Sequence, residues 1–165
     1  MSWFSHIANL SNPFDLASLY IRHILYGDIQ LVILDAVLIL TIHGFYIFFL
    51  ARLFGKVVHK TKIGKSLKGG LLMYSLMIVL VASTHIMDIF ALALALDSFK
   101  VFGDPLSTFH YVSGMYTTIG SNLDPRSGWE GLSLILSFTG LLAFSISGSG
   151  LYTMLGYFIS SEKGN

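Results

Sequence analysis

The sequence predicts an all-α membrane protein with three transmembrane helices, a short re-entrant pore helix with a filter loop, and an N-terminal interfacial helix. Of its 165 residues, 54% are hydrophobic and only 12% are charged, about half the charged fraction of a soluble domain. Several apolar runs reach the roughly 20 residues that cross a bilayer. One further apolar segment is too short to cross. The lipid bilayer is therefore an expected partner, because it covers this surplus apolar surface.

The composition also excludes several classes of protein. The net charge of +1 indicates no nucleic-acid partner. The absence of cysteine excludes disulfides and thiolate metal sites. The chain contains no nucleotide-binding loop, haem-attachment motif or hydrolytic triad, so we expect no enzyme activity and no cofactor. The N-terminus lacks the pattern of a cleaved signal peptide.

Residues 1–30 are predicted to form an N-terminal amphipathic segment. Pro13, with Asn12 and Asp15 beside it, is typical of a helix start. Apolar residues then recur at helical spacing, which predicts a helix that lies at the membrane surface or packs on the bundle. A flexible leader is the alternative.

Two apolar runs, 31–54 and 71–96, are predicted to span the membrane. The loop between them, 55–68, carries five lysines, and with Arg52 the stretch holds six of the ten Lys and Arg residues. Such a short basic loop stays in the cytoplasm. The first span therefore runs inward and the second outward, which places the N-terminus outside in a multi-pass protein of the cell (inner) membrane.

The segment 97–130 is too polar to span the membrane and too apolar for an ordinary loop. Its middle part, 106–117, is about three helical turns long, which is too short for the hydrocarbon core. Asp104 and Pro105 form a typical helix start, with proline at the first helical position. Irregular backbone at membrane depth must be covered by protein or water, so a half-length helix followed by glycine-containing backbone predicts a re-entrant segment. Thr117, Thr118 and Gly120 offer hydroxyl and carbonyl oxygens that can replace the water shell of a cation. We therefore predict a re-entrant pore helix at 105–117 and a filter at 117–124.

A third span is predicted at 131–158, interrupted at Gly148-Ser149-Gly150 and followed by a tail at 159–165. With the basic loop inside, the pore segment enters from the outer face and the C-terminus is cytoplasmic. Residues 31–158 thus form one transmembrane domain.

Three short motifs accompany this topology. The pore segment contains Tyr116-Thr117-Thr118-Ile119-Gly120, and Trp129 precedes the last span. The first span carries His43 before an apolar stretch, and the second carries His85-Ile86-Met87-Asp88. Over 31–158 these features resemble the pore module of potassium channels. More narrowly, the chain resembles the small bacterial potassium-channel-like proteins of the pore-domain (ion channel) superfamily, whose second-span motif is His-x-x-Glu.

The resemblance implies a homotetrameric cation channel in which four filter segments surround one axis. Oxygen atoms of the filter would replace the water shell of a monovalent cation, K⁺ or Na⁺. Thr118 would supply hydroxyl and carbonyl oxygens, and Ile119 and Gly120 would supply carbonyl oxygens. The last span would be the inner helix, with Gly148 or Gly150 as its hinge. The filter residues are Thr117, Thr118, Ile119, Gly120, Ser121 and Asn122.

The filter departs from the family signature after its first glycine. The signature continues Gly-Tyr-Gly-Asp, whereas this chain continues Gly120-Ser121-Asn122-Leu123-Asp124. Ser121 replaces the tyrosine that wedges the filter, and Asn122 replaces the second glycine, although asparagine tolerates left-handed backbone. Asp124 partly replaces the acid at the outer mouth. A less complete filter discriminates less between ions, so we expect weak cation selectivity or no conduction.

Asp35, His43, His85 and Asp88 lie well inside the predicted spans. A charge at mid-bilayer costs at least about 2.5–3.5 kcal/mol. Counted from the outer ends of their spans, His43 and His85 lie at nearly the same depth, and Asp88 shares a face with His85. We expect these three to tie the spans together by hydrogen bonds. A metal site, a proton relay and a pH sensor are the alternatives.

Three functions stay open from the sequence. The first is the tetrameric channel. The second is a non-conducting accessory subunit that keeps the channel fold and binds other membrane subunits. The third is an intramembrane metal site at His43, His85 and Asp88. For the filter motif alone, a simple turn before a transmembrane helix is a further alternative.

Overall fold

The computed structural model describes residues 12–24, 28–60 and 66–163, and these residues form helices and connecting loops without a strand. Three helices are long and apolar enough to cross a membrane, which confirms an all-helical protein with three candidate spans. The helices are α2 (Pro13–Ile24), α3 (Ile29–Lys60), α4 (Leu67–Ser98), α5 (Pro105–Tyr116) and α6 (Leu132–Lys163). The predicted N-terminal helix is confirmed as α2, and its place at a membrane surface stays a prediction.

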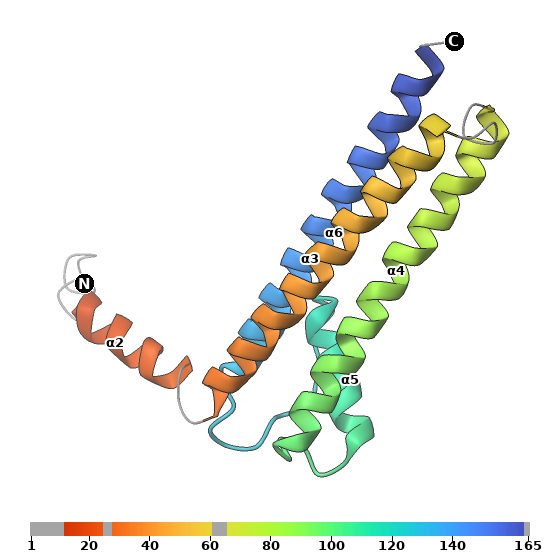
Figure 1. Ribbon diagram of the computed structural model, residues 1–165. Helices are drawn as coiled ribbons and strands as arrows, with labels where there is room; N and C mark the ends of the chain where they lie inside the picture. The colour runs from red at the N-terminus through yellow and green to blue at the C-terminus, as the bar shows by residue number, and fades with distance from the viewer. Residues whose placement is uncertain (1–11, 25–27, 61–65, 164–165) are drawn as a thin grey trace, which may run out of the picture.

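The three long helices lie side by side, and the short helix α5 lies against one end of the bundle (Figure 1). The chain leaves α4 at Ser98, turns, and runs back along α4 as α5. The segment 117–131 then returns to the same end of the bundle, where α6 begins. The segment between α4 and α6, residues 99–131, is called the excursion below. The backbone amide of Arg126 donates to the carbonyl of Val101 at 3.2 Å, which joins the end of the excursion to its start.

The start of α5 matches the prediction from Asp104 and Pro105. The Asp104 carboxylate accepts a hydrogen bond from the Ser107 amide at 2.9 Å and another from the Ser107 hydroxyl at 2.7 Å. These two donors hold the pKa of Asp104 below its usual range. Pro105 occupies the first turn, where its missing N–H leaves no donor unpaired. The helix ends at Tyr116, one residue before the predicted end.

The predicted loop at 55–68 is wrong at both ends. Helix α3 continues through Lys60, and α4 already begins at Leu67, while 61–65 lie outside the described residues. The helix continues because Val58 is buried against the core and Gly55 lies against the ring of Tyr157, 3.2 Å from the place of a Cβ. At Gly70, a Cβ would overlap the Phe158 ring.

The predicted interruption of the last span is also wrong, because α6 is helical through Gly148 and Gly150 and continues into the predicted tail as far as Lys163. A Cβ at Gly150 would overlap the Ile47 side chain, so this glycine permits close packing of α6 on α3. Gly148 has open space around it. A hinge at either glycine stays a prediction.

Two buried clusters hold the bundle together. One surrounds α5 and includes Tyr111, Tyr116 and Leu136, and the other lies toward the opposite end around Phe54 and Met154. The outward faces of the long helices remain apolar, and most of their large side chains are exposed. Contiguous apolar surface of this extent is not stable in water. It fits lipid or further protein around the bundle.

The glycines of α6 supply a matched pair of variants. A Cβ at Gly140 would overlap the Tyr116 carbonyl oxygen, whereas one at Gly148 meets nothing within 4 Å. We expect Gly140→Ala to separate α6 from α5 and cost about 2 kcal/mol, which lowers Tm by about 4–8 °C. Gly148→Ala should raise Tm, because alanine favours a helix interior by about 1 kcal/mol. Thermal unfolding in detergent measures both, and an equal response would contradict the close contact at Gly140.

Candidate functional site

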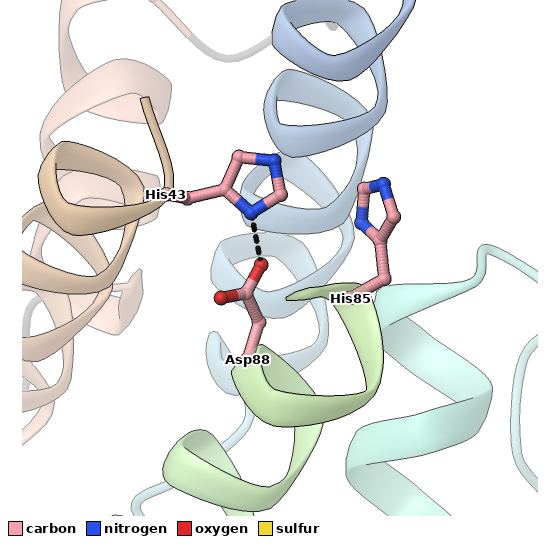
Figure 2. Close-up of side chains that lie close together, drawn as sticks. All are labelled: His43, His85 and Asp88. Atoms are coloured by element: carbon pink, nitrogen blue, oxygen red, sulfur yellow. Dashed lines mark hydrogen bonds and ion pairs between the residues drawn. The ribbon is translucent and has the colours of Figure 1, made fainter. Parts of the chain in front are cut away.

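A buried hydrogen-bond network lies in the middle of the bundle and centres on the Asp88 carboxylate. Its Oδ2 atom is 2.7 Å from Nδ1 of His43 and accepts a hydrogen bond from the Tyr116 hydroxyl at 2.8 Å. Figure 2 shows the His43 and Asp88 side chains directed toward each other from α3 and α4. All three residues are buried, Tyr116 completely. The network therefore joins α3, α4 and α5 at one point.

Two further side chains extend the network. The second ring nitrogen of His43, Nε2, is 2.9 Å from the Ser147 hydroxyl of α6. Nδ1 of His85 is 3.0 Å from the Tyr116 hydroxyl, and the His85 ring stacks on Phe144 of α6 at 4.2 Å between centroids. Side chains of all four bundle helices thus meet here.

The hydrogen bonds determine which atoms donate. An ionised carboxylate only accepts hydrogen bonds. If Asp88 is ionised, Nδ1 of His43 therefore donates to it. If the His43 ring is neutral, its other nitrogen, Nε2, accepts a hydrogen bond from the Ser147 hydroxyl. The single hydroxyl proton of Tyr116 goes to Asp88, so Nδ1 of His85 donates to Tyr116. Every donor and acceptor pairing is consistent with neutral histidines around one carboxylate.

The predicted meeting of His43, His85 and Asp88 is present in the structure. The two imidazole centroids lie 4.9 Å apart, as equal depth in neighbouring spans requires. The sequence analysis missed Tyr116 and Ser147. One sequence feature could have indicated Tyr116, namely its position directly before the predicted filter at the end of α5. No sequence feature indicated Ser147, because serine is common in transmembrane helices.

The same three residues can hold a metal ion, since their ligand atoms lie within 4.8 Å of one another. An ion between them would compete with the 2.7 Å bond from His43 to Asp88. In the observed arrangement the Asp88 Oδ2 atom, both nitrogens of His43 and one nitrogen of His85 are already hydrogen-bonded. The geometry therefore favours the structural role over the metal site.

The predicted filter segment begins directly after Tyr116 and occupies the inner tip of the excursion from one bundle end (Figure 1). Thr118 has φ 61° and Gly120 has φ 90°, whereas Ile119 between them does not have a positive φ. Thr118 is a β-branched residue in the left-handed region, which costs about 1–3 kcal/mol. Ile119 is 85% exposed. The tip is thus a strained and uncovered backbone segment.

Three residues of the predicted filter have polar atoms bonded to α5. The Thr117 hydroxyl donates to the Ser113 carbonyl at 2.7 Å, and the Thr118 amide donates to the Met115 carbonyl at 3.0 Å. The Gly120 amide donates to the Gly114 carbonyl at 3.0 Å, and a Cβ at Gly114 would overlap the Gly120 carbonyl oxygen. The Gly120 carbonyl therefore faces α5 in this conformation.

The outer part of the predicted filter is less tightly held. The Ser121 hydroxyl accepts a hydrogen bond from the Leu123 amide at 3.2 Å, which closes a local turn. Asn122 and Asp124 are exposed. Asp124 lies with Lys100 and Arg126 around a pocket of about 510 Å³ at the end of the bundle.

Asp35 is the one predicted intramembrane residue that does not join the network. Its Oδ2 atom is buried and has no hydrogen-bond partner among the described residues. It lies about two turns from the start of α3, closer to the bundle end than His43.

Comparison of the chain with protein-family models, with curated proteins and with solved structures gave no match. The residues and contacts of the chain itself are therefore the basis for its proposed function.

The Tyr116 hydroxyl can be tested by its removal. Tyr116→Phe leaves one lone-pair site of the buried Asp88 carboxylate and one nitrogen of His85 without a partner. We expect a loss of about 1–3 kcal/mol in the free energy of unfolding, seen as a lower Tm in detergent. The control is Tyr152→Phe, which removes the same atom from a side chain that is 78% exposed. Equal stability of the two variants would show that the network contributes nothing.

Proposed function

We propose that this chain is the pore-forming subunit of a homotetrameric, weakly selective cation channel in the cell membrane. One observation carries the proposal: α5 runs only partway along the bundle, and the backbone that follows it returns to the end from which α5 started. In this proposal α5 is a re-entrant pore helix and 117–122 is the filter.

The direction of α5 supports a cation at its tip. The C-terminal end of a helix carries about half a negative charge, and α5 points this end at Thr117 to Gly120. The same end favours a cation that has lost part of its water shell. The φ angles at Thr118, Ile119 and Gly120 alternate in sign, so this backbone is irregular, as membrane proteins allow only where protein or water covers it. A filter requires such backbone, because its carbonyl oxygens replace the water shell of the ion.

The exposure of the tip supports assembly. Thr118, Ile119 and Gly120 are exposed in the single chain. Exposed irregular backbone at membrane depth requires protein or water to cover it. Four copies around a central water-filled axis satisfy this requirement for each tip. The strained φ of Thr118 also persists only where the surroundings enforce it, which fits a functional backbone segment.

The Gly120 carbonyl is the reason to propose weak selectivity. This carbonyl faces α5 through the contact with Gly114. In the tetramer, the rings of carbonyl oxygens nearest the axis would therefore come from Thr118 and Ile119. Ser121 stands where the resembled family has a tyrosine, and its hydroxyl closes a turn with Leu123. Fewer coordinating rings leave a cation more hydrated, and the hydration differences between K⁺ and Na⁺ then count for less.

The same carbonyl favours a second candidate, a non-conducting subunit that uses the channel fold to bind other membrane proteins. If the Gly120 carbonyl keeps its contact with α5 in the assembly, the filter lacks a ring. In that case the apolar outer faces of the helices would serve contacts with other subunits. Conduction by the purified protein separates the two candidates.

Flux through reconstituted protein tests the channel directly. We expect K⁺ and Na⁺ flux in proteoliposomes, and we expect Gly120→Ala to reduce it about tenfold, because alanine at φ 90° is strained by about 1–3 kcal/mol. The control is Gly103→Ala. Neither glycine has an atom within 4 Å of the added methyl, but only Gly120 has a positive φ.

The absence of flux from the native chain, beside a channel that conducts under the same conditions, would overturn the channel and favour the accessory subunit. Equal flux through the two alanine variants would remove Gly120 from the filter.

Selectivity tests the register of the filter. The triple variant Ser121→Tyr, Asn122→Gly and Leu123→Asp restores the residues of the resembled signature after Gly120. We expect the ratio of K⁺ to Na⁺ flux to rise, because a complete set of carbonyl rings replaces the water shell more fully. Leu106→Tyr, which introduces a tyrosine at an exposed position of α5, is the control for the effect of an added aromatic side chain. An unchanged ratio in a folded, conducting triple variant would show that the register is wrong.

A further inference from the structure

A basic pocket lies at the end of the bundle opposite α5. It has a volume of about 350 Å³ and is lined by Arg52, Gly55, Lys56, His59, Lys60 and Tyr157. Five of these residues lie on one face of the last turns of α3, and Tyr157 comes from α6. The pocket therefore combines four basic side chains with one phenol ring.

The floor of the pocket depends on one glycine. The Tyr157 ring lies 3.2 Å from the place of a Cβ at Gly55, so a larger residue there would push the ring outward. The His59 ring meets Tyr157 edge to face at 6.2 Å between centroids. The Arg52 guanidinium lies over the Phe48 ring, 4.6 Å from its centroid. Aromatic rings thus hold two of the bases in place.

The depth of the pocket matches a layer of lipid headgroups. Arg52 is the first Lys, Arg, Asp or Glu residue after Asp35 in α3. The stretch from Ile29 to Ala51 is about 34 Å long at 1.5 Å per residue, and the hydrocarbon core is about 30 Å thick. Arg52 therefore lies at the edge of the core, and Lys56 and Lys60 lie beyond it. A tyrosine at this level is typical of the aromatic belt.

Other roles of the bases do not explain the pocket. Among the residues whose side chains the structure describes, no carboxylate forms an ion pair with Arg52, Lys56 or Lys60. Compensation of the α3 dipole acts within the last turn, and Arg52 lies about two turns before the end. The positive-inside rule requires only that basic residues lie near the loop between α3 and α4. It does not require that they surround a cavity.

We infer that this pocket binds the phosphate group of an anionic phospholipid, with Arg52 and Lys56 as its main ligands. An arginine fork and a lysine ammonium one helical turn apart in the same pocket suit phosphate oxygens. The acyl chains would lie along the apolar outer surface of α3 toward Phe48. Free inorganic phosphate offers the same oxygens but no acyl chains, so the source of the phosphate can be distinguished by experiment. This inference does not depend on conduction.

Native mass spectrometry of the full chain in a neutral detergent measures lipid binding. The probes are dioleoyl phosphatidylglycerol, dioleoyl phosphatidylcholine and inorganic phosphate. We expect tight binding of phosphatidylglycerol only. Each base near a membrane surface strengthens anionic-lipid binding about fivefold, so Arg52→Gln with Lys56→Gln should weaken it by about 25-fold. Each single variant should weaken it about fivefold.

The matched control is Lys100→Gln with Arg126→Gln, which removes two positive charges at the other end of the bundle. We expect it to change the affinity for phosphatidylglycerol less than twofold. Equal effects of the two double variants would show that net charge alone determines the affinity for phosphatidylglycerol, and this would overturn the inference. Equal binding of both lipids would also overturn it. Competition by inorganic phosphate at the same concentration as the lipid would assign the pocket to free phosphate instead.

Discussion

The Asp88 carboxylate imposes the constraint on which the bundle depends. A carboxylate in the middle of a membrane has no water to bind, so protein donors must surround it. His43 and Tyr116 supply these donors from α3 and α5, and Ser147 and His85 complete their hydrogen bonds from α6 and α4. Apolar packing alone gives little specificity between helices in lipid. One polar centre thus specifies how four helices meet.

The same centre positions the segment after α5. Tyr116 is the last residue of that helix, so anchoring its hydroxyl to Asp88 fixes the depth at which the following backbone begins. The Ser137 hydroxyl of α6 bonds the Met115 carbonyl at 3.1 Å, and Gly140 lets α6 approach the Tyr116 carbonyl. These contacts hold the start of the segment on two sides. They explain how a β-branched residue at position 118 can keep a positive φ.

The two ends of the bundle differ in kind. One end has the α5 excursion, with an exposed backbone tip and few basic residues. The other end has a cluster of bases around Tyr157, at the distance from Ile29 that a hydrocarbon core requires. The start of the α5 excursion and the proposed lipid site therefore lie at opposite ends of the same helices. Helix α6 reaches both ends without a break, and at Gly150 it packs closely on Ile47 of α3.

The sequence was sufficient to predict the three apolar helices, the short helix that starts at Asp104 and Pro105, and the equal depth of His43 and His85, because length, capping residues and helical rise are properties of one segment. It did not predict the helical ends of α3 and α6, since burial of Val58 and contact with Tyr157 depend on neighbouring helices. The hydrogen bonds of Tyr116 and Ser147 in the network, and the direction of the Gly120 carbonyl toward α5, are seen only in the folded chain. The spacing of apolar residues shows which residues share a face of one helix. It does not show which residue of another helix that face contacts, because this depends on how the helices pack and on the path of irregular backbone segments.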